Sequence, residues 1–316
     1  MKTVLLTGGA GMIGSNLSRN LLDNGYSVVI LDDFSSGIEI NIDKRANIIK
    51  GSVEDTSLLD NIFNEFSFEY VFHLAALFAN QNSVDHPEKD LNVNGMGTLR
   101  VLQKTYDSFL LGKTKRFFYA SSSCVYGMQA GSISENNSKH LETPYAITKL
   151  LGEQYTTFFH DLYKLPFTTF RFFNSYGPGE LPGQYRNVIP NFIDKALKNE
   201  AITITGTGDE TRDFTFIDDT IAAIMSTIDK NHCIGKTYNI STGTETKIID
   251  LAKKIISLTN SKSEIIFKER RNWDHTLRRC GNIELIQQDT GFTPKHSIDD
   301  GLSKTIEWLK PLISKN

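Results

Sequence analysis

Short apolar runs alternate along the first half of the chain with longer segments whose apolar residues recur every three or four positions. The short runs are continuous in apolar residues, which is typical of parallel strands covered on both faces. They lie at 2–8, 27–33, 47–52, 70–76, 116–123 and 167–174. The longer segments have the periodicity of crossover helices and lie at 12–24, 56–66, 88–111 and 144–162. This alternation predicts an α/β fold with a doubly wound parallel sheet.

The texture changes after about Tyr176, where Gly and Pro cluster in YGPGELPGQY and the regular alternation ends. Segments 190–200 and 249–259 have helical periodicity, while 201–208 and 236–242 look like short strands. We therefore expect a sheet domain over residues 1–175. Residues 176–316 are expected to form a smaller, irregular C-terminal substrate lobe, partly interleaved with the first domain.

Composition restricts the class of protein without naming it. The chain has 316 residues, 39% hydrophobic and 22% charged, with a net charge of -3, so it carries no electrostatic footprint for nucleic acid or an anionic membrane. The N-terminus does not resemble a signal peptide, and the longest apolar runs have only strand length. The three cysteines, Cys124, Cys233 and Cys280, are far apart. We expect a cytoplasmic protein without disulfides or a metal.

A glycine-rich segment, TGGAGMIGSNL, follows the first expected strand and opens the first expected helix. Gly8, Gly11 and Gly14 allow a sharp turn, a close approach of backbone amides to a pyrophosphate, and close packing of helix on strand. Alone, this spacing could be only a tight turn. The next strand ends in Asp32 and Asp33, where a carboxylate can bind ribose hydroxyls. No Arg or Lys follows in DDFSSG to accept a 2′-phosphate, so the sequence predicts a Rossmann-type domain that binds NAD.

Tyr145 and Lys149 lie four residues apart in TPYAITKLLGEQY, so both side chains fall on one face of a helix. In isolation such a pair is typical of a helix surface. Beside a nicotinamide, the lysine would bind ribose hydroxyls and favour the phenolate. Lowering a tyrosine pKa from about 10 to near 7 takes roughly 4 kcal/mol, within reach of an ammonium and a positive ring. Tyr145 is therefore a candidate general base.

The strand YASSSCVYG ends in three serines at the edge where doubly wound sheets bind ligands. A hydroxyl there could hydrogen-bond both a substrate oxygen and Tyr145, or it could cap the loop. With this strand in place, the chain resembles an extended short-chain dehydrogenase/reductase of the NAD-dependent epimerase/dehydratase family of nucleotide-sugar enzymes. The matching pieces, in the family's order from about Lys2 to Trp308, are TGGAGMIG, DD, HLAA, NVNGMGT, SSSCVYG, YAITK, RFFNSYGP and GTGDETRDFTFIDD.

The resemblance implies a role for each matching residue. It makes Ser122 the catalytic hydroxyl, Tyr145 the base and Lys149 its partner, and it makes Asn94 a brace for the active-site helix. The expected cofactor-binding residues are Gly8, Gly11, Met12, Ile13, Gly14, Asp32, Asp33, Ser35, Ser36, Gly37, Ser52, Val53, Leu74, Ala75, Ala76, Asn94, Tyr145, Lys149 and Phe172. Similar enzymes usually carry an acidic residue at the position of Ser52.

The C-terminal lobe is expected to hold a nucleotide-diphosphate sugar. The expected substrate-binding residues are Phe78, Ser122, Ser123, Asn174, Asn187, Val188, Arg212 and Arg278. A guanidinium can bind two phosphate oxygens at once. Arg212 could instead pair with Asp209, Glu210 or Asp213, and Arg270 and Arg271 compete with Arg278 for the ligand role. Residues 78–87 are expected to form a loop over the nicotinamide and the sugar.

Several reactions remain open for such an enzyme. Dehydratases and decarboxylases of the family carry carboxylates directly after the catalytic hydroxyl, where this chain has Ser123 and Cys124, so both reactions are disfavoured. Cys124 resembles the cysteine of 3,5-epimerases, but the lysine that would oppose it is missing between Gly177 and Pro190. The sequence favours epimerisation at C4 through a 4-keto sugar, with a one-way 4-dehydrogenase or reductase as the alternative. A catalytically inactive NAD sensor or scaffold is the non-enzyme alternative.

The resemblance also implies a homodimer. Similar enzymes commonly dimerise through the helix that contains YAITK and the long helix before it. In this chain FLLG and EQYTTFFHDLY offer apolar and aromatic surface for such a contact, although the same residues could be internal.

Overall fold

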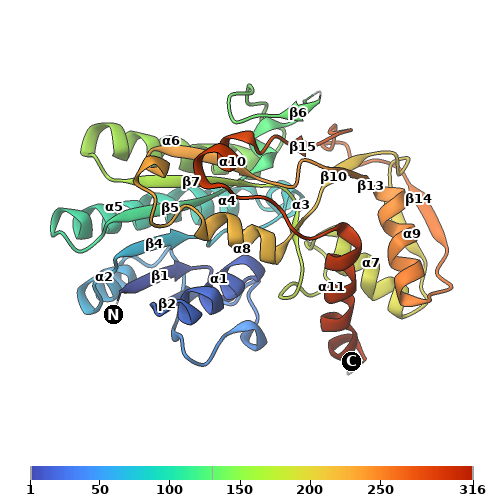
Figure 1. The fold of residues 1–316 in the computed structure, drawn as a ribbon, viewed down its shortest axis with the longest axis horizontal. Coiled ribbons are helices and arrows are strands. Elements are labelled where there is room, and N and C mark those ends of the chain that lie inside the picture. The colour runs from blue at the N-terminus through green and yellow to red at the C-terminus, as the bar shows by residue number, and fades with distance from the viewer. Residues whose placement is uncertain (1, 130, 315–316) are drawn as a thin grey trace.

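The computed structural model describes residues 2–129 and 131–314. Met1, where the first expected domain begins, and Asn316, where the second ends, lie outside the described residues, as do Ala130 and Lys315. Its centre is a seven-stranded sheet in which every neighbouring pair of strands is parallel (Figure 1). The strand order is β12-β7-β5-β4-β1-β2-β3. The strands are β1 (Thr3–Thr7), β2 (Ser27–Asp32), β3 (Asn47–Lys50), β4 (Tyr70–His73), β5 (Arg116–Ser122), β7 (Phe167–Phe172) and β12 (Lys236–Ile240). The predicted doubly wound α/β fold is confirmed.

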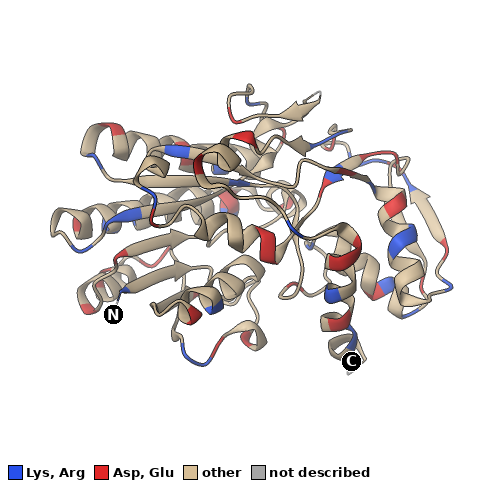
Figure 2. Cartoon of the chain, in the orientation of Figure 1, with Lys and Arg blue, Asp and Glu red and all other residues tan. Residues whose placement is uncertain are grey.

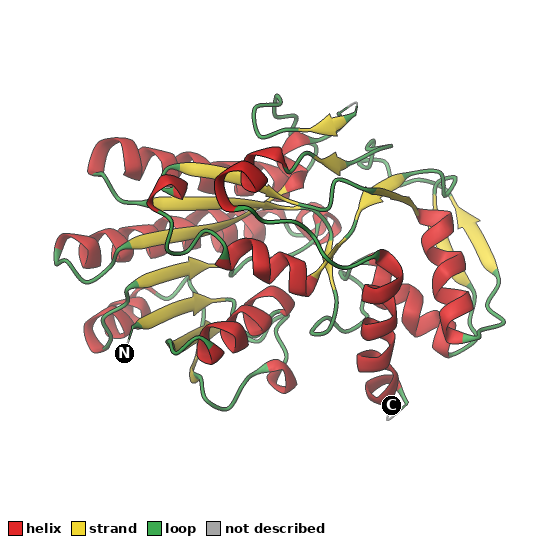
Figure 3. Ribbon diagram, viewed as in Figure 1, coloured by secondary structure: helices red, strands yellow, loops and turns green. Residues whose placement is uncertain are grey.

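Helices cover both faces of this sheet (Figure 3). Val4 and Leu6 of β1 belong to one apolar cluster, together with residues of α1 (Met12–Asp23) and α8 (Ile217–Met225). Leu5 points the other way, into a second cluster. That cluster includes residues of α2 (Thr56–Glu65), α5 (Gly97–Leu110) and α6 (Pro144–Tyr163). Because successive side chains of a strand face opposite sides, a continuous apolar run is what such a two-sided sheet requires.

The C-terminal lobe combines three longer helices with small two-stranded sheets. The helices are α7 (Val188–Leu197), α9 (Ile248–Thr259) and α11 (Ile298–Ile313). Strand β9 (Ile202–Thr205) pairs with β14 (Ile265–Lys268), and β10 (Thr211–Asp213) pairs with β13 (Glu245–Lys247).

Shorter elements lie in both halves of the chain. They are α3 (Asn80–Asp85), α4 (Pro87–Asp90), α10 (Glu284–Thr290), β6 (Ser132–Ile133), β8 (Ser175–Tyr176), β11 (Thr215–Phe216) and β15 (Cys280–Gly281). Basic and acidic residues are interspersed over the chain (Figure 2).

Four expectations about the elements need correction. Strand β12, expected in the smaller lobe, is an edge strand of the main sheet beside β7. The helix expected over 88–111 is interrupted by a wide π-helical turn, Leu91–Met96. The expected loop 78–87 contains α3. Strand β3 lies at the other edge of the sheet and is largely exposed, so it is not the buried strand that its apolar residues predicted. None of the helices in the described ranges is long and apolar enough to span a membrane.

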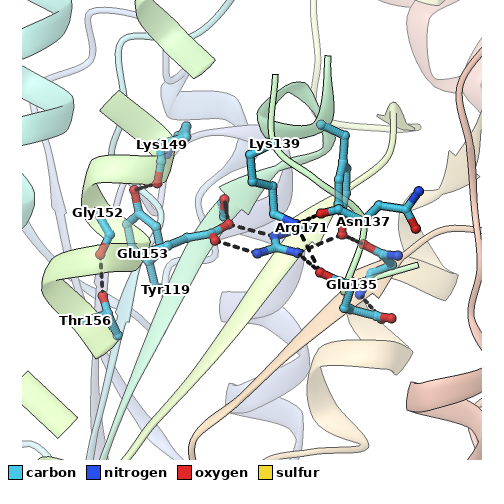
Figure 4. Close-up of polar contacts among 12 residues, drawn as sticks. Tyr119, Glu135, Asn137, Lys139, Lys149, Gly152, Glu153, Thr156 and Arg171 are labelled. Carbon is cyan, nitrogen blue, oxygen red and sulfur yellow. Dashed lines mark hydrogen bonds and ion pairs between the residues drawn. The ribbon is translucent and has the colours of Figure 1, made fainter. Parts of the chain in front are cut away.

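A buried ion pair ties α6 to the sheet (Figure 4). Arg171 of β7 donates through Nε and Nη2 to the two carboxylate oxygens of Glu153 on α6, at 2.8 and 2.7 Å. Its Nη1 donates to the Tyr126 hydroxyl and the Glu135 carbonyl oxygen, and Ser121 of β5 donates to Glu153 at 2.5 Å. Both charged side chains are about 6–7% exposed. Such a pair is geometrically demanding, because a charge that loses its partner stays buried.

We predict strong coupling between these two residues. Glu153→Gln and Arg171→Met should each lower the free energy of unfolding by about 3–5 kcal/mol, since each leaves an uncompensated buried charge. The double variant should lose clearly less than the sum of the two losses, because it leaves no ion behind. Urea titration of the four proteins measures the coupling. Additive losses would show that the pair does not act as a unit.

Candidate active site

The glycine loop joins β1 to α1 at the carboxyl edge of the sheet. A Cβ on Gly8 would come 2.6 Å from the backbone nitrogen of Ala75, and one on Gly14 would overlap the carbonyl oxygen of Gly8. Only glycine fits at these two positions. Gly11 is the N-cap of α1 and provides no side-chain cap, so amides of the first helical turn remain for a ligand. A helix start of this kind fits a pyrophosphate.

Asp32 fixes this loop at the end of β2. Its carboxylate accepts hydrogen bonds from the backbone N–H groups of Ala10 and Phe34, both at 2.9 Å. Burial raises the pKa of this carboxyl above its ordinary value. Asp33 is exposed and accepts from the Ser35 N–H at 2.8 Å. Both carboxylates line the cavity, where they can bind ribose hydroxyls and would repel a 2′-phosphate. The residues present therefore fit NAD.

A continuous cavity of about 570 Å³ runs from the glycine loop to the C-terminal lobe. Most of the residues expected in the site line it. These are Gly8, Gly11, Met12, Ile13, Gly14, Asp32, Asp33, Ser35, Ser36, Ser52, Val53, Leu74, Ala75, Ala76, Phe78, Ser122, Ser123, Tyr145, Lys149, Phe172, Asn174, Asn187, Val188 and Arg212. Three expected residues, Gly37, Asn94 and Arg278, lie outside the lining.

Ser122, Tyr145 and Lys149 meet where β5 ends against the start of α6. Tyr145 and Lys149 are 7% and 4% exposed, and the Lys149 ammonium lies 5.7 Å from the centre of the Tyr145 ring. The ammonium donates to the Ala120 carbonyl oxygen at 2.8 Å, which fixes it to the strand that carries Ser122. Thr143 caps α6 by accepting from the Ala146 N–H at 3.2 Å. The helix therefore starts at a defined place relative to β5.

Burial acts against the charged forms of both Tyr145 and Lys149. Burial raises the pKa of the Tyr145 hydroxyl well above its ordinary value, and a contact with Ser122 opposes this only in part. Burial lowers the pKa of Lys149 to about 8, against the opposing effects of Asp90 and Glu153. The sequence expectation already combines Lys149 with a positive nicotinamide ring, and with Lys149 alone the pKa of the phenol stays above its ordinary value. A second positive charge near the phenol is needed, and a bound nicotinamide ring would supply it.

Asn94 lies behind the cavity rather than in its wall. Its Oδ1 accepts from the Leu77 N–H at 2.7 Å, and its Nδ2 donates to Asp90 at 2.7 Å and to the Thr148 hydroxyl on α6 at 3.4 Å. Thr148 in turn donates to Asp90 at 2.6 Å. The wide turn that interrupts the expected helix is where Asn94 lies. Asn94 thus links the loop after β4 to α6, as a brace does, and the expected contact with the cofactor stays a prediction for a residue outside the cavity lining.

Arg278 and Gly37 also need correction. Arg278 is exposed and pairs with Glu245, whereas the next residue, Arg279, is buried and lines the cavity. The backbone oxygens of Leu277 and Arg279 accept from the N–H groups of Thr211 and Asp213. Side chains of an extended segment alternate between its two sides, so Arg278 faces away from the cavity. Gly37 packs against Ala10 and Asp32, behind the carboxylate.

Several further cavity residues were not named individually from the sequence, although Asn80 and Gln81 belong to the loop that was expected over the nicotinamide and the sugar. They are Asn80, Gln81, Glu142, Thr143, Tyr185, Arg186, Trp273, Thr276 and Arg279. Trp273 donates to Gln81 at 2.9 Å, and Thr276 donates to Glu142 at 3.2 Å. These contacts join segments far apart along the chain. A residue that reaches the cavity wall through a contact of this kind has no local spacing pattern in the sequence. One of these segments, YGPGELPGQY, was recognised only as an irregular loop.

Comparison with known proteins agrees with this geometry. The model of the NAD dependent epimerase/dehydratase family matches residues 4–241. A putative UDP-glucose 4-epimerase of Methanocaldococcus jannaschii is 32% identical, covering 97% of this chain and 98% of that protein. A UDP-glucose 4-epimerase of Mycolicibacterium smegmatis is also 32% identical, with the same coverage of both chains.

Solved structures are similar over the same extent. An epimerase from the pseudomurein-containing methanogen Methanothermobacter thermautotrophicus superposes with a TM-score of 0.95 at 44% identity, covering 100% of this chain and 95% of that one. A UDP-glucose 4-epimerase of Thermotoga maritima, solved with UDP-glucose, gives 0.94 at 32% identity, covering 98% and 99%. The chain therefore belongs to the NAD dependent epimerase/dehydratase family, as its motifs predict, and its cofactor is NAD.

Proposed function

We propose that this enzyme is a nucleotide-sugar 4-epimerase in which Tyr145 is the catalytic base. The observation that supports the proposal is the burial of Tyr145, Lys149 and Ser122 together, in the wall of a cavity that the glycine loop and Arg212 also line. Relatives over the whole chain are described as UDP-glucose 4-epimerases. This supports the class of reaction without identifying the sugar.

The mechanism assigns one task to each residue. NAD held by the glycine loop and the Asp32 end of β2 would supply a reversible hydride acceptor. Tyr145 takes the proton of the C4 hydroxyl while hydride leaves C4, which gives a 4-keto sugar. Ser122 donates a hydrogen bond to the C4 oxygen, and Lys149 stabilises the phenolate by its charge. Tyr145 returns the proton after the ketone has turned its other face to the hydride.

A strap formed by residues 178–187 supports an epimerase over a one-way dehydrogenase. Asn16 of α1 donates to the Pro178 carbonyl oxygen at 2.9 Å, and Asn41 donates to that of Gly179 at 2.8 Å. Arg186 donates to the Ser36 carbonyl oxygen at 2.5 Å. The strap is thus tied to both segments that border the cofactor end of the cavity. An epimerase has to retain its reduced cofactor between the two hydride transfers, and such a closure favours retention.

Elimination of water from the sugar is less well supported than epimerisation at C4, although dTDP-glucose 4,6-dehydratases are among the relatives. Elimination of this kind needs an acid beside the reacting sugar. The two residues after Ser122 are Ser123, which is buried, and Cys124, whose thiol accepts a hydrogen bond from the Asn80 amide at 3.4 Å. Neither is a carboxylic acid. The proposed reaction therefore ends with return of the hydride to C4.

We predict the outcome of turnover in heavy water. When UDP-, GDP-, CDP- and dTDP-sugars are incubated with the protein in D₂O, one carrier class should give a product inverted at C4 without deuterium on any ring carbon. The hydride comes from the same sugar, so solvent contributes none. NMR and mass spectrometry detect both properties, and NADH should not accumulate in solution. Deuterium at C3 or C5 would point to proton exchange by Cys124, and a released ketone with NADH to a dehydrogenase.

Two variants separate the chemistry from the fold in this assay. Tyr145→Phe should lower the rate of inversion by roughly 100-fold or more, because it removes the general base. Tyr163→Phe, on the same helix but outside the cavity lining, should leave the rate unchanged. Equal rates for wild type and Tyr145→Phe would exclude Tyr145 as the base.

We also propose a homodimer through α5 and α6. The outer side of α6 carries Ile147, Phe158 and Leu162, which are 51%, 49% and 58% exposed, and Leu110 at the end of α5 is 64% exposed. Ile147, Phe158 and Leu162 are spaced so that they form one stripe along the helix. An apolar stripe of this kind on the surface is typical of an interface. It is the surface that the family resemblance implies.

We predict that Phe158→Asp disrupts this dimer. Analytical ultracentrifugation of the wild type should give twice the chain mass of 35.5 kDa, and the variant should sediment as a monomer at micromolar concentration. Phe267→Asp is the matched control, because Phe267 is 54% exposed on β14, in the other lobe. A monomeric wild type, or a variant that still dimerises, would contradict the proposed interface.

A further inference from the structure

Arg279 is a buried cation inside the catalytic cavity. Its side chain lies on the segment that leads into β15, it is 8% exposed as a residue, and it lines the cavity. Nη2 donates to the Thr276 hydroxyl at 2.9 Å, and Nη1 donates to the Cys124 sulfur at 3.6 Å. These partners are a hydroxyl and a thiol, so neither brings a negative charge to the guanidinium.

The charge of Arg279 has no direct counterion. Within residues 2–129 and 131–314, no carboxylate lies within ion-pair distance of it, and its buried Nε has no hydrogen-bond partner. Glu142 is reached only through Thr276, whose hydroxyl donates to Glu142 at 3.2 Å. Arg171, by contrast, is fully paired, because it binds Glu153 through two hydrogen bonds.

An uncompensated buried guanidinium is unfavourable unless a ligand completes it. Arg116 is also buried with only neutral partners and an unpartnered Nε, but it lies outside the cavity lining. Arg279 instead faces the cavity with donors that match the two oxygens of a carboxylate or phosphate. The structure therefore indicates an anion-binding position here.

The position of this cation identifies which part of a substrate it meets. Cys124 is two residues after Ser122, and its backbone N–H donates to the Ser122 hydroxyl oxygen at 3.2 Å. Asn80 contacts both Cys124 and Thr143, the cap of the helix that carries Tyr145. Arg279 thus lies beside the groups that take the C4 proton, where the sugar ring must be. Arg212, which also lines the cavity, remains available for a diphosphate.

We propose that Arg279 binds a carboxylate carried by the sugar itself, so that the substrate is a nucleotide-linked acidic sugar such as a hexuronate. The inference rests on the proposed function, since it places the sugar by the position of Tyr145. A neutral sugar would leave the guanidinium buried without a partner. A carboxylate would pair with the guanidinium through two hydrogen bonds. The enzyme would then prefer the acidic sugar over a neutral one, because the neutral sugar leaves the buried charge of Arg279 unpaired.

Substrate preference and its loss on substitution test this assignment. The wild type should have a kcat/KM for UDP-glucuronate about 10- to 100-fold higher than for UDP-glucose. Arg279→Gln should lower kcat/KM for UDP-glucuronate by a similar factor and leave UDP-glucose nearly unchanged, so that the preference disappears. Inhibition by UDP, which carries the diphosphate but no sugar, should be the same in wild type and variant. Arg278→Gln is the matched control, because the neighbouring arginine is exposed and should not change the preference.

Each other outcome has a defined meaning. If the wild type epimerises UDP-glucose as well as or better than UDP-glucuronate, the assignment is overturned while the proposed function stands. If Arg279→Gln weakens inhibition by UDP as much as it weakens use of UDP-glucuronate, Arg279 binds the diphosphate and the assignment is again overturned. If neither the acidic nor the neutral sugar is converted on any of the four carriers, the proposed function fails as well. The wild-type preference is decisive even if Arg279→Gln does not fold.

Discussion

The burial of a lysine ammonium beside a tyrosine phenol, at the carboxyl edge of a parallel sheet, is the constraint on which this structure depends. The Ala120 carbonyl oxygen fixes the ammonium, and Asn94, Asp90 and Thr148 brace the helix that carries both residues. Further along that helix, Glu153 anchors it to the sheet through Arg171. Burial acts against both charged forms, so the protein holds the two groups in place without ionising the phenol. Ionisation of the phenol requires the positive charge of a bound cofactor.

The sequence predicted the parallel sheet well because each strand and its crossover helix carry their own signal. Apolar runs mark strands that are covered on both faces, and the glycine loop marks the first turn. The edges of the sheet were predicted less well. Strand β12 follows a long excursion through the C-terminal lobe, so nothing local reveals that it returns to lie beside β7. Strand β3 is apolar in sequence but has a neighbour on one side only, which leaves Ile48 exposed.

The site was predictable as far as its residues lie in contiguous motifs. The glycines, Asp32, Ser122, Tyr145 and Lys149 all belong to short segments whose spacing encodes their geometry. Arg279 was missed by one residue, because the side of an extended segment on which a residue falls depends on its pairing with β10, which spacing alone does not give. The strap and Trp273 reach the cavity through tertiary contacts, and the pKa of Tyr145 depends on burial. Both are properties of the folded chain rather than of any motif.

The ionisation of Tyr145 with and without NAD tests this account most directly. Ultraviolet difference spectroscopy between wild type and Tyr145→Phe isolates the tyrosinate of this one residue as pH is raised. Without cofactor, the pKa of Tyr145 should lie above the ordinary tyrosine value of about 10, and NAD⁺ should lower it by about two units or more. A tyrosinate that forms near neutral pH without NAD⁺, or a pKa that NAD⁺ leaves unchanged, would contradict the account.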